Sequence, residues 1–138
     1  MRPPRVVWRP LRHLRIYRAL GVIAIAVMLA LSLLPIGGVG PALPHGDKLQ
    51  HALAYLLLAG GYAQLLEGWR SRAWLAASLL LLGVLVEGLQ SLTPWRSAEL
   101  ADLLANSVGI TLGLLLTVRR GSRLLEALEQ RDGRAGTT

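Results

Sequence analysis

The chain has 138 residues, 53% of them hydrophobic and 17% charged, whereas about 25% of residues are charged in ordinary soluble domains. Its mean hydropathy of +0.47 excludes such a domain, its length favours one domain, and its lack of cysteine excludes a disulfide framework and a thiolate zinc site. The net charge of +7 would indicate a nucleic-acid partner only if the basic residues gathered on one folded face.

Residues 1–18 form a basic segment with six arginines spaced at roughly helical intervals. Apolar and aromatic side chains lie between these arginines. After Pro10, this pattern allows a short amphipathic helix on an anionic leaflet. A charge cluster that only sets the orientation of the first span is the simpler interpretation, and we favour it.

Four apolar runs follow, and each approaches the length that crosses a bilayer. At a rise of 1.5 Å per residue, about 20 helical residues match a hydrocarbon core of about 30 Å. The first run is longer than the apolar region of a signal peptide, about 7–15 residues, and no small-x-small cleavage site follows it. The predicted spans are residues 19–36, 49–66, 73–92 and 100–118.

The residues after the fourth span, 119–138, form a polar basic tail. Leu124, Leu125 and Leu128 predict one or two amphipathic turns within it. The last residues are polar, so we expect them to be disordered.

The basic residues lie almost wholly on one side of the predicted spans. Thirteen of the 15 occur in residues 1–18, 67–72 and 119–138, and the other two are Lys48 and Arg96. Because cytoplasmic loops are enriched in Lys and Arg, both termini are predicted to be cytoplasmic. The arginines then act as membrane anchors, and no nucleic-acid partner is expected. The sequence thus predicts an all-α, multi-pass protein of the bacterial cytoplasmic membrane with four transmembrane helices.

The polar residues of the second, third and fourth spans form three stripes, because residues three or four positions apart share one helix face. The stripes are Asp47, His51 and Tyr55; Glu87 and Gln90; and Asp102 and Asn106. Lipid excludes such groups unless they are partnered or hydrated. We therefore expect the stripes to face one another near the extracytoplasmic surface. Gly109 and Gly113 continue the third stripe as a GxxxG motif, which predicts a helix-packing surface.

Several of these residues also have a purely structural interpretation. Asp47 and Lys48 suit a helix end, and Asp102 suits the positive end of a helix dipole. Buried amides can link helices for about 0.6–2 kcal/mol each. Glu87 is the hardest to explain in this way, because it lies within the third span and needs a cation, a donor or water.

The polar residues form four short motifs in a fixed order. They are Asp47-Lys48-x-x-His51-x-x-x-Tyr55, Glu87-x-x-Gln90, Pro94-x-Arg96 and Asp102-x-x-x-Asn106-x-x-Gly109. This ordered set resembles the VanZ-like family of small bacterial membrane proteins. The resemblance covers roughly residues 32–113 and implies a four-helix integral membrane protein of the cell envelope. The founding member of that family is associated with resistance to the glycopeptide teicoplanin, and the resemblance implies no reaction.

Two classes of function are compatible with this pattern. In the first, which we favour, a non-enzymatic envelope factor binds an anionic lipid, a lipid-linked cell-wall precursor, another membrane protein or a second copy of itself. Lys48 and Arg96 would meet a phosphate, and Glu87 and Asp102 would hold those cations. The expected ligand-binding residues are Lys48, His51, Tyr55, Glu87, Gln90, Arg96, Asp102 and Asn106.

In the second class, the protein is a hydrolase or transferase that acts on a phospholipid or polyprenyl phosphate. His51 or Glu87 would be the general base, Asp47 would orient His51, and Arg96 would stabilise developing charge. The nearest hydroxyl nucleophiles are Ser91 and Ser97. This class is less favoured because no nucleophile–base pair is evident in the sequence.

A metal site is a weaker hypothesis. Asp47, His51, Glu87 and Asp102 are suitable ligand types for a divalent ion. The chain has no histidine-rich spacing such as HxxxH. Neither a metal nor an organic cofactor is therefore expected.

Overall fold

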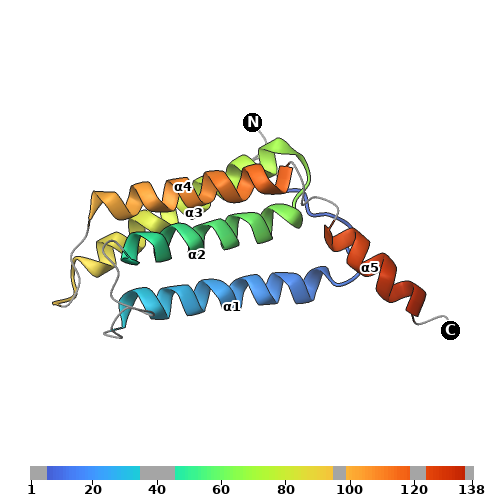
Figure 1. Cartoon of the computed structure of the whole chain (residues 1–138), viewed down its shortest axis with the longest axis horizontal. Coiled ribbons are helices and arrows are strands. Elements are labelled where there is room, and N and C mark those ends of the chain that lie inside the picture. The colour runs from blue at the N-terminus through green and yellow to red at the C-terminus, as the bar shows by residue number, and fades with distance from the viewer. Residues whose placement is uncertain (1–5, 35–45, 95–98, 119–123, 136–138) are drawn as a thin grey trace.

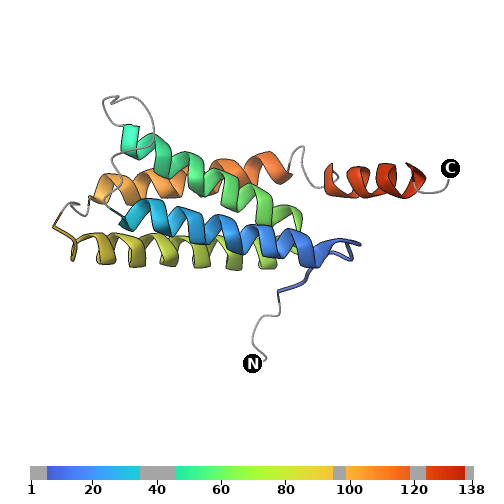
Figure 2. The same cartoon turned by 90° about the horizontal axis from the view of Figure 1, so that it is seen from below.

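The computed structural model of the chain describes residues 6–34, 46–94, 99–118 and 124–135. These residues form five helices and no strand, which confirms the all-α class. Helices α1 to α4 lie side by side as an antiparallel bundle, and α5 lies beyond one end of it (Figures 1 and 2). The helices are α1 (Leu14–Leu33), α2 (Gly46–Gln64), α3 (Gly68–Gln90), α4 (Leu100–Leu116) and α5 (Leu124–Ala135).

Each predicted span overlaps one helix, but α1 and α3 begin about one turn earlier than expected. α1 begins at Leu14, so Arg15 and Arg18 lie in its first turns, and residues 6–13, the described part of the segment before it, contain no separate amphipathic helix. α3 begins at Gly68, because the chain reverses within three residues after α2. Gly68 has a φ of 74°, a left-handed conformation that glycine adopts without a steric penalty.

Two of the described helices, α1 and α3, are long and apolar enough to cross a bilayer. α4 is apolar but has only 17 residues. α2 has 19 residues, and its polar first turns, with Asp47, Lys48 and His51, make it less apolar than the other two. Length and composition therefore indicate a membrane protein, with two helices that meet the criterion for a span.

The most extensive contact between helices joins α2 to α4, and it depends on glycine. A Cβ atom at Gly109 would overlap the carbonyl oxygen of Ala52. A Cβ atom at Gly113 would lie 2.5 Å from the carbonyl oxygen of Leu56. The predicted GxxxG packing surface is confirmed, because both glycines allow the two backbones to approach closely.

The N-terminal segment is hydrogen-bonded to the turn between α2 and α3. The Arg9 N–H donates to the Leu65 carbonyl, and the Glu67 N–H donates to the Val7 carbonyl, each at 2.9 Å. The Val7 N–H also donates to the Ser71 hydroxyl at 3.0 Å. The basic segments of the chain therefore meet at one end of the bundle, where α5 also lies (Figure 1).

The C-terminal tail differs from the prediction, because α5 is a helix of 12 residues rather than one or two turns. Residues 136–138, at the end of the predicted disorder, lie outside the described residues. The Glu129 carboxylate accepts hydrogen bonds from the backbone N–H groups of Arg12 and His13, both at 2.9 Å. Arg9 Nη1 donates to Glu126 Oε1 at 2.7 Å. His13 makes no side-chain cap for α1, so Glu129 caps that helix from a distant part of the chain.

Replacing Glu129 with alanine is expected to release α5 from α1. Burial raises the pKa of Glu129, but the backbone N–H groups of His13 and Arg12 outweigh it and hold the pKa below the usual value of 4.5. A lowered carboxylate pKa means that the contact is complete above about pH 4.5 and is lost as the pH falls through the lowered value. Hydrogen exchange of the α5 amides would measure the release. Gln130→Ala is the matched control, and equal exchange in the two variants would contradict the capping role.

Candidate functional site

α1 and α3 end, and α2 and α4 begin, at the same end of the bundle (Figure 1). The polar stripes of α2, α3 and α4 converge there. Tyr55, Glu87, Gln90, Asp102 and Asn106 are buried there. Asp47, Lys48 and His51 are partly buried beside them. Arg96 lies outside the described residues, so its expected contacts stay a prediction.

His51 on α2 is oriented by Asn106 on α4. Its Nδ1 atom lies 3.1 Å from Asn106 Oδ1. An amide oxygen only accepts hydrogen bonds, so Nδ1 carries the hydrogen and a neutral ring presents its lone pair on Nε2. The expected orientation of His51 by Asp47 is wrong, because the Asp47 carboxylate accepts a hydrogen bond from Lys48 instead.

Lys48 is surrounded by carboxylates. Its ammonium lies 2.8 Å from Glu99, 3.0 Å from Asp47 and 3.4 Å from Asp102. Asp102 therefore holds a cation, as expected, but Lys48 faces acids rather than open space for a phosphate. The sequence reasoning missed Glu99. The sequence feature that could have identified Glu99 is its position directly before an apolar helix, because a carboxylate is favoured at the positive end of the helix dipole.

Glu87 is the most isolated charge of the cluster. Only 5% of the residue is exposed, and its Oε2 accepts one hydrogen bond, from the Glu99 N–H at 3.0 Å. Its Oε1 is buried and has no hydrogen-bond partner among the described residues. One ligand atom each of His51, Glu87 and Asp102 lie within 4.8 Å of one another. Three helices thus bring an imidazole and two carboxylates to a single point.

Gln90 faces α1 and does not hydrogen-bond to this cluster. Its Nε2 donates to the Ser32 carbonyl at 3.0 Å. It therefore links α3 to α1, which supports the structural interpretation of this amide.

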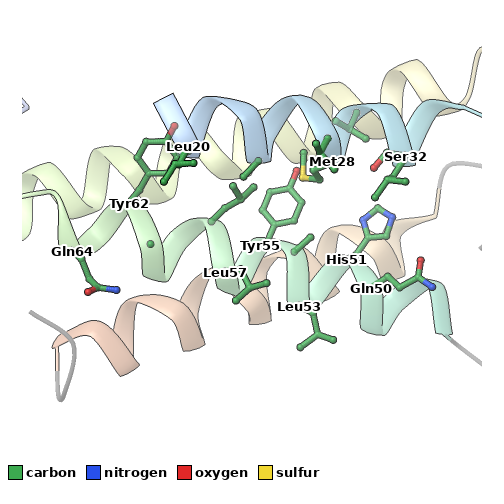
Figure 3. A pocket seen from close by; sticks show the side chains of 18 of the residues that line it. Leu20, Met28, Ser32, Gln50, His51, Leu53, Tyr55, Leu57, Tyr62 and Gln64 are labelled. Atoms are coloured by element: carbon green, nitrogen blue, oxygen red, sulfur yellow. The ribbon is translucent and has the colours of Figure 1, made fainter. Parts of the chain in front are cut away.

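A groove of about 660 Å³ opens between α1 and α2, and the sequence reasoning did not foresee it. In Figure 3, His51, Tyr55 and Tyr62 point from α2 toward α1, which carries Met28 and Ser32. Most of the lining is apolar. Asp47, Gln50 and His51 line the end of the groove that meets the cluster, which is the more polar end, and Tyr62 and Gln64 line the other end. The sequence assigned no role to α1 beyond a span, because that helix carries almost no polar residues.

The described geometry offers no nucleophile to His51. The Ser91 hydroxyl donates to the Gly88 carbonyl at 2.7 Å, so it closes the end of α3. No hydrogen bond joins a serine to His51 in the described part of the chain, and Ser97 lies outside it. Among the described residues, His51 therefore forms no serine–histidine pair of the kind that activates a nucleophile.

Comparisons with protein-family models, curated proteins and solved structures found no match to this chain.

Proposed function

We propose that this chain is a multi-pass protein of the bacterial cytoplasmic membrane, that α1 to α4 all span the bilayer, and that the groove between α1 and α2 binds a lipid or lipid-linked molecule. The observation that carries the proposal is this groove, whose lining is mainly apolar and whose more polar end carries Asp47 and His51. Binding sites for small molecules commonly combine a mainly apolar lining with a few polar groups, at volumes of about 300–1,000 Å³.

The outward faces of all four helices support four spans rather than two. Val22 on α1 is 62% exposed, Leu49 on α2 55%, Leu81 on α3 59% and Leu104 on α4 62%. Soluble proteins rarely expose apolar surface of this extent, whereas acyl chains would cover it in a membrane. The 17 residues of α4 extend about 25 Å, and local thinning of the bilayer can accommodate so short a helix.

The distribution of basic residues supports an orientation. The N-terminal segment, the α2–α3 turn and α5 lie together at one end of the bundle. The positive-inside rule favours the cytoplasm for this end. The polar cluster and the polar end of the groove then lie near the extracytoplasmic surface.

The charges of the cluster constrain the head of the ligand. Lys48 is already paired with the carboxylates of Asp47, Glu99 and Asp102. The buried carboxyl group of Glu87 is a fourth acidic group in the cluster and does not contact Lys48. An anionic headgroup therefore requires positive charge from elsewhere, either from Arg96 or from an added cation. The resemblance to VanZ-like proteins supports a lipid-linked envelope precursor as the ligand and a link to glycopeptide (teicoplanin) resistance, and we carry both forward as proposals.

Filling the groove is expected to abolish lipid binding. Gly61 lines the groove, and a Cβ atom there would meet nothing within 4 Å, so Gly61→Trp places an indole in the open space. We expect at least about tenfold weaker binding of phosphatidylglycerol or undecaprenyl phosphate, a change of about 1.4 kcal/mol. Native mass spectrometry of the purified protein would count the bound lipid.

Gly88→Trp is the matched control, because a Cβ atom at Gly88 also meets nothing within 4 Å and Gly88 does not line the groove. It should bind lipid as the wild type does. Equal binding by the two tryptophan variants, or no binding of either lipid by the wild type, would overturn the proposal.

A further inference from the structure

Two charge clusters share one residue, Asp102. In the first, Asp47, Glu99 and Asp102 lie within 4.8 Å of one another, and the Lys48 ammonium contacts all three. The second consists of His51, Glu87 and Asp102. Among the described residues, no Lys or Arg forms an ion pair with Glu87. The first cluster therefore has its own cation, whereas in the second Lys48 contacts Asp102 but not Glu87.

One buried oxygen of Glu87 has neither a hydrogen bond nor an ion pair. Glu87 Oε1 has no partner in the described part of the molecule, although the residue is only 5% exposed. Asp102 Oδ1, on a residue 6% exposed, has no hydrogen-bond partner there, but it lies 3.4 Å from the Lys48 ammonium in an ion pair. The Tyr55 hydroxyl, on a residue 2% exposed, is also without a hydrogen-bond partner there, and it lies close to Asn106 beside Gly83. A buried carboxylate oxygen without a partner is costly, and a cation removes that cost.

The ring of His51 is arranged as metal-binding imidazoles usually are. Such rings commonly donate one N–H to an oxygen of the protein, which fixes the tautomer and directs the other nitrogen at the ion. Here Nδ1 donates to Asn106 Oδ1 at 3.1 Å, and Nε2 keeps its lone pair.

We propose that His51, Glu87 and Asp102 bind one divalent transition-metal ion of the Zn²⁺ or Mn²⁺ class. Two ligand atoms on one ion can be separated by no more than twice the bond length, about 4–5 Å for bonds of 2.0–2.4 Å. The separations here stay within 4.8 Å. An imidazole with two carboxylates suits a transition ion better than Mg²⁺ or Ca²⁺, which prefer oxygen ligands alone.

Three protein ligands leave coordination positions open. His51 also lines the more polar end of the groove, so a headgroup bound there would lie beside the site. The ion would supply the positive charge that a phosphate needs there. The metal site itself does not depend on lipid binding, because its three ligands come from α2, α3 and α4 and not from α1.

The test uses the full chain, purified without a histidine tag and stripped with a chelator. Elemental analysis after dialysis against Zn²⁺ or Mn²⁺ gives the ion content, and competition with a chelating indicator gives the affinity. We expect one ion per chain in the wild type and a loss of affinity of about 100-fold in Glu87→Gln and in His51→Gln. Asp47→Asn removes a carboxylate of the Lys48 cluster only, and its affinity should stay within about fivefold of the wild type.

A second measurement separates the loss of ligands from misfolding. Saturating ion should raise the melting temperature of the wild type and of Asp47→Asn, and leave that of Glu87→Gln unchanged. Gly61→Trp fills the groove but leaves the three proposed ligands in place, so this variant should still bind the ion. The lipid proposal and the metal proposal can therefore fail independently. Equal ion content in the wild type and Glu87→Gln would overturn the inference. If the Arg96→Gln variant binds the ion and the wild type does not, the inference is also overturned. That result would mean that the Arg96 guanidinium supplies the positive charge beside Glu87 in the wild type.

Discussion

Replacing Gly109 with alanine is expected to force α4 away from α2 and to lower the stability of the folded protein markedly. The new methyl group would overlap the carbonyl oxygen of Ala52 and lie about 3.0 Å from the Leu56 backbone nitrogen, and backbone atoms do not rotate aside as a side chain does. Overpacking of a close contact typically costs about 1–3 kcal/mol, and more where the backbone must shift. The α2–α4 contact is the most extensive in the bundle, so its loss should also move His51 away from Asn106.

Thermal unfolding of the purified protein would measure this effect, with Gly88→Ala as the control. A Cβ atom at Gly88 meets nothing within 4 Å, so alanine there should stabilise α3 by up to about 1 kcal/mol through its higher helix propensity. The two alanine substitutions are thus expected to act in opposite directions. A Gly109→Ala variant as stable as Gly88→Ala would mean that α2 and α4 are not in close contact.

Cysteine labelling is expected to give an all-or-none answer on the number of spans. The natural chain has no cysteine, so a single introduced thiol has no background. If α1 to α4 all cross, Leu92→Cys lies outside the cell and Glu67→Cys inside. A membrane-impermeant maleimide should then label intact cells only at residue 92, which is 81% exposed.

A protein in which only α1 and α3 cross gives the reverse pattern. The α2–α3 turn would then lie outside, and the end of α3 would lie inside, although the termini stay cytoplasmic. Gln130→Cys on α5 is the control, because both arrangements keep it inside the cell. Labelling at residue 67 and not at residue 92 would therefore reject the four-span proposal and leave the two-span arrangement.

The helices and their polar faces could be predicted from the sequence because both depend on local spacing. Apolar length identifies a helix, and residues three or four apart share a face whatever the helix packs against. The GxxxG motif likewise identified the surface of α4 that meets α2. Helix ends were less accurate, since the early starts of α1 and α3 depend on a distant cap and on a glycine turn.

The partners within the site could not be predicted, because they depend on how far each helix slides along its neighbours. The spacing of Asp47 and His51 suggested a pair, yet the register of α2 and α4 places His51 beside Asn106, and Asp47 accepts a hydrogen bond from the adjacent Lys48. The groove left no local signal, and the leucines of α5 predicted one or two turns but neither the length nor the position of that helix. The groove depends on the distance between α1 and α2, and α5 is placed by Glu129, which bonds to residues 116 and 117 positions away.

That last contact has a consequence for the order in which the molecule can be assembled. Ribosomes make the N-terminal segment first, but its backbone bonds require the α2–α3 turn, more than 50 residues later. The amino end of α1 is capped only once Glu129 has been synthesised, 116 residues after His13. This segment therefore reaches its final structure later than the helices made after it, and premature termination before α5 would leave the start of α1 uncapped.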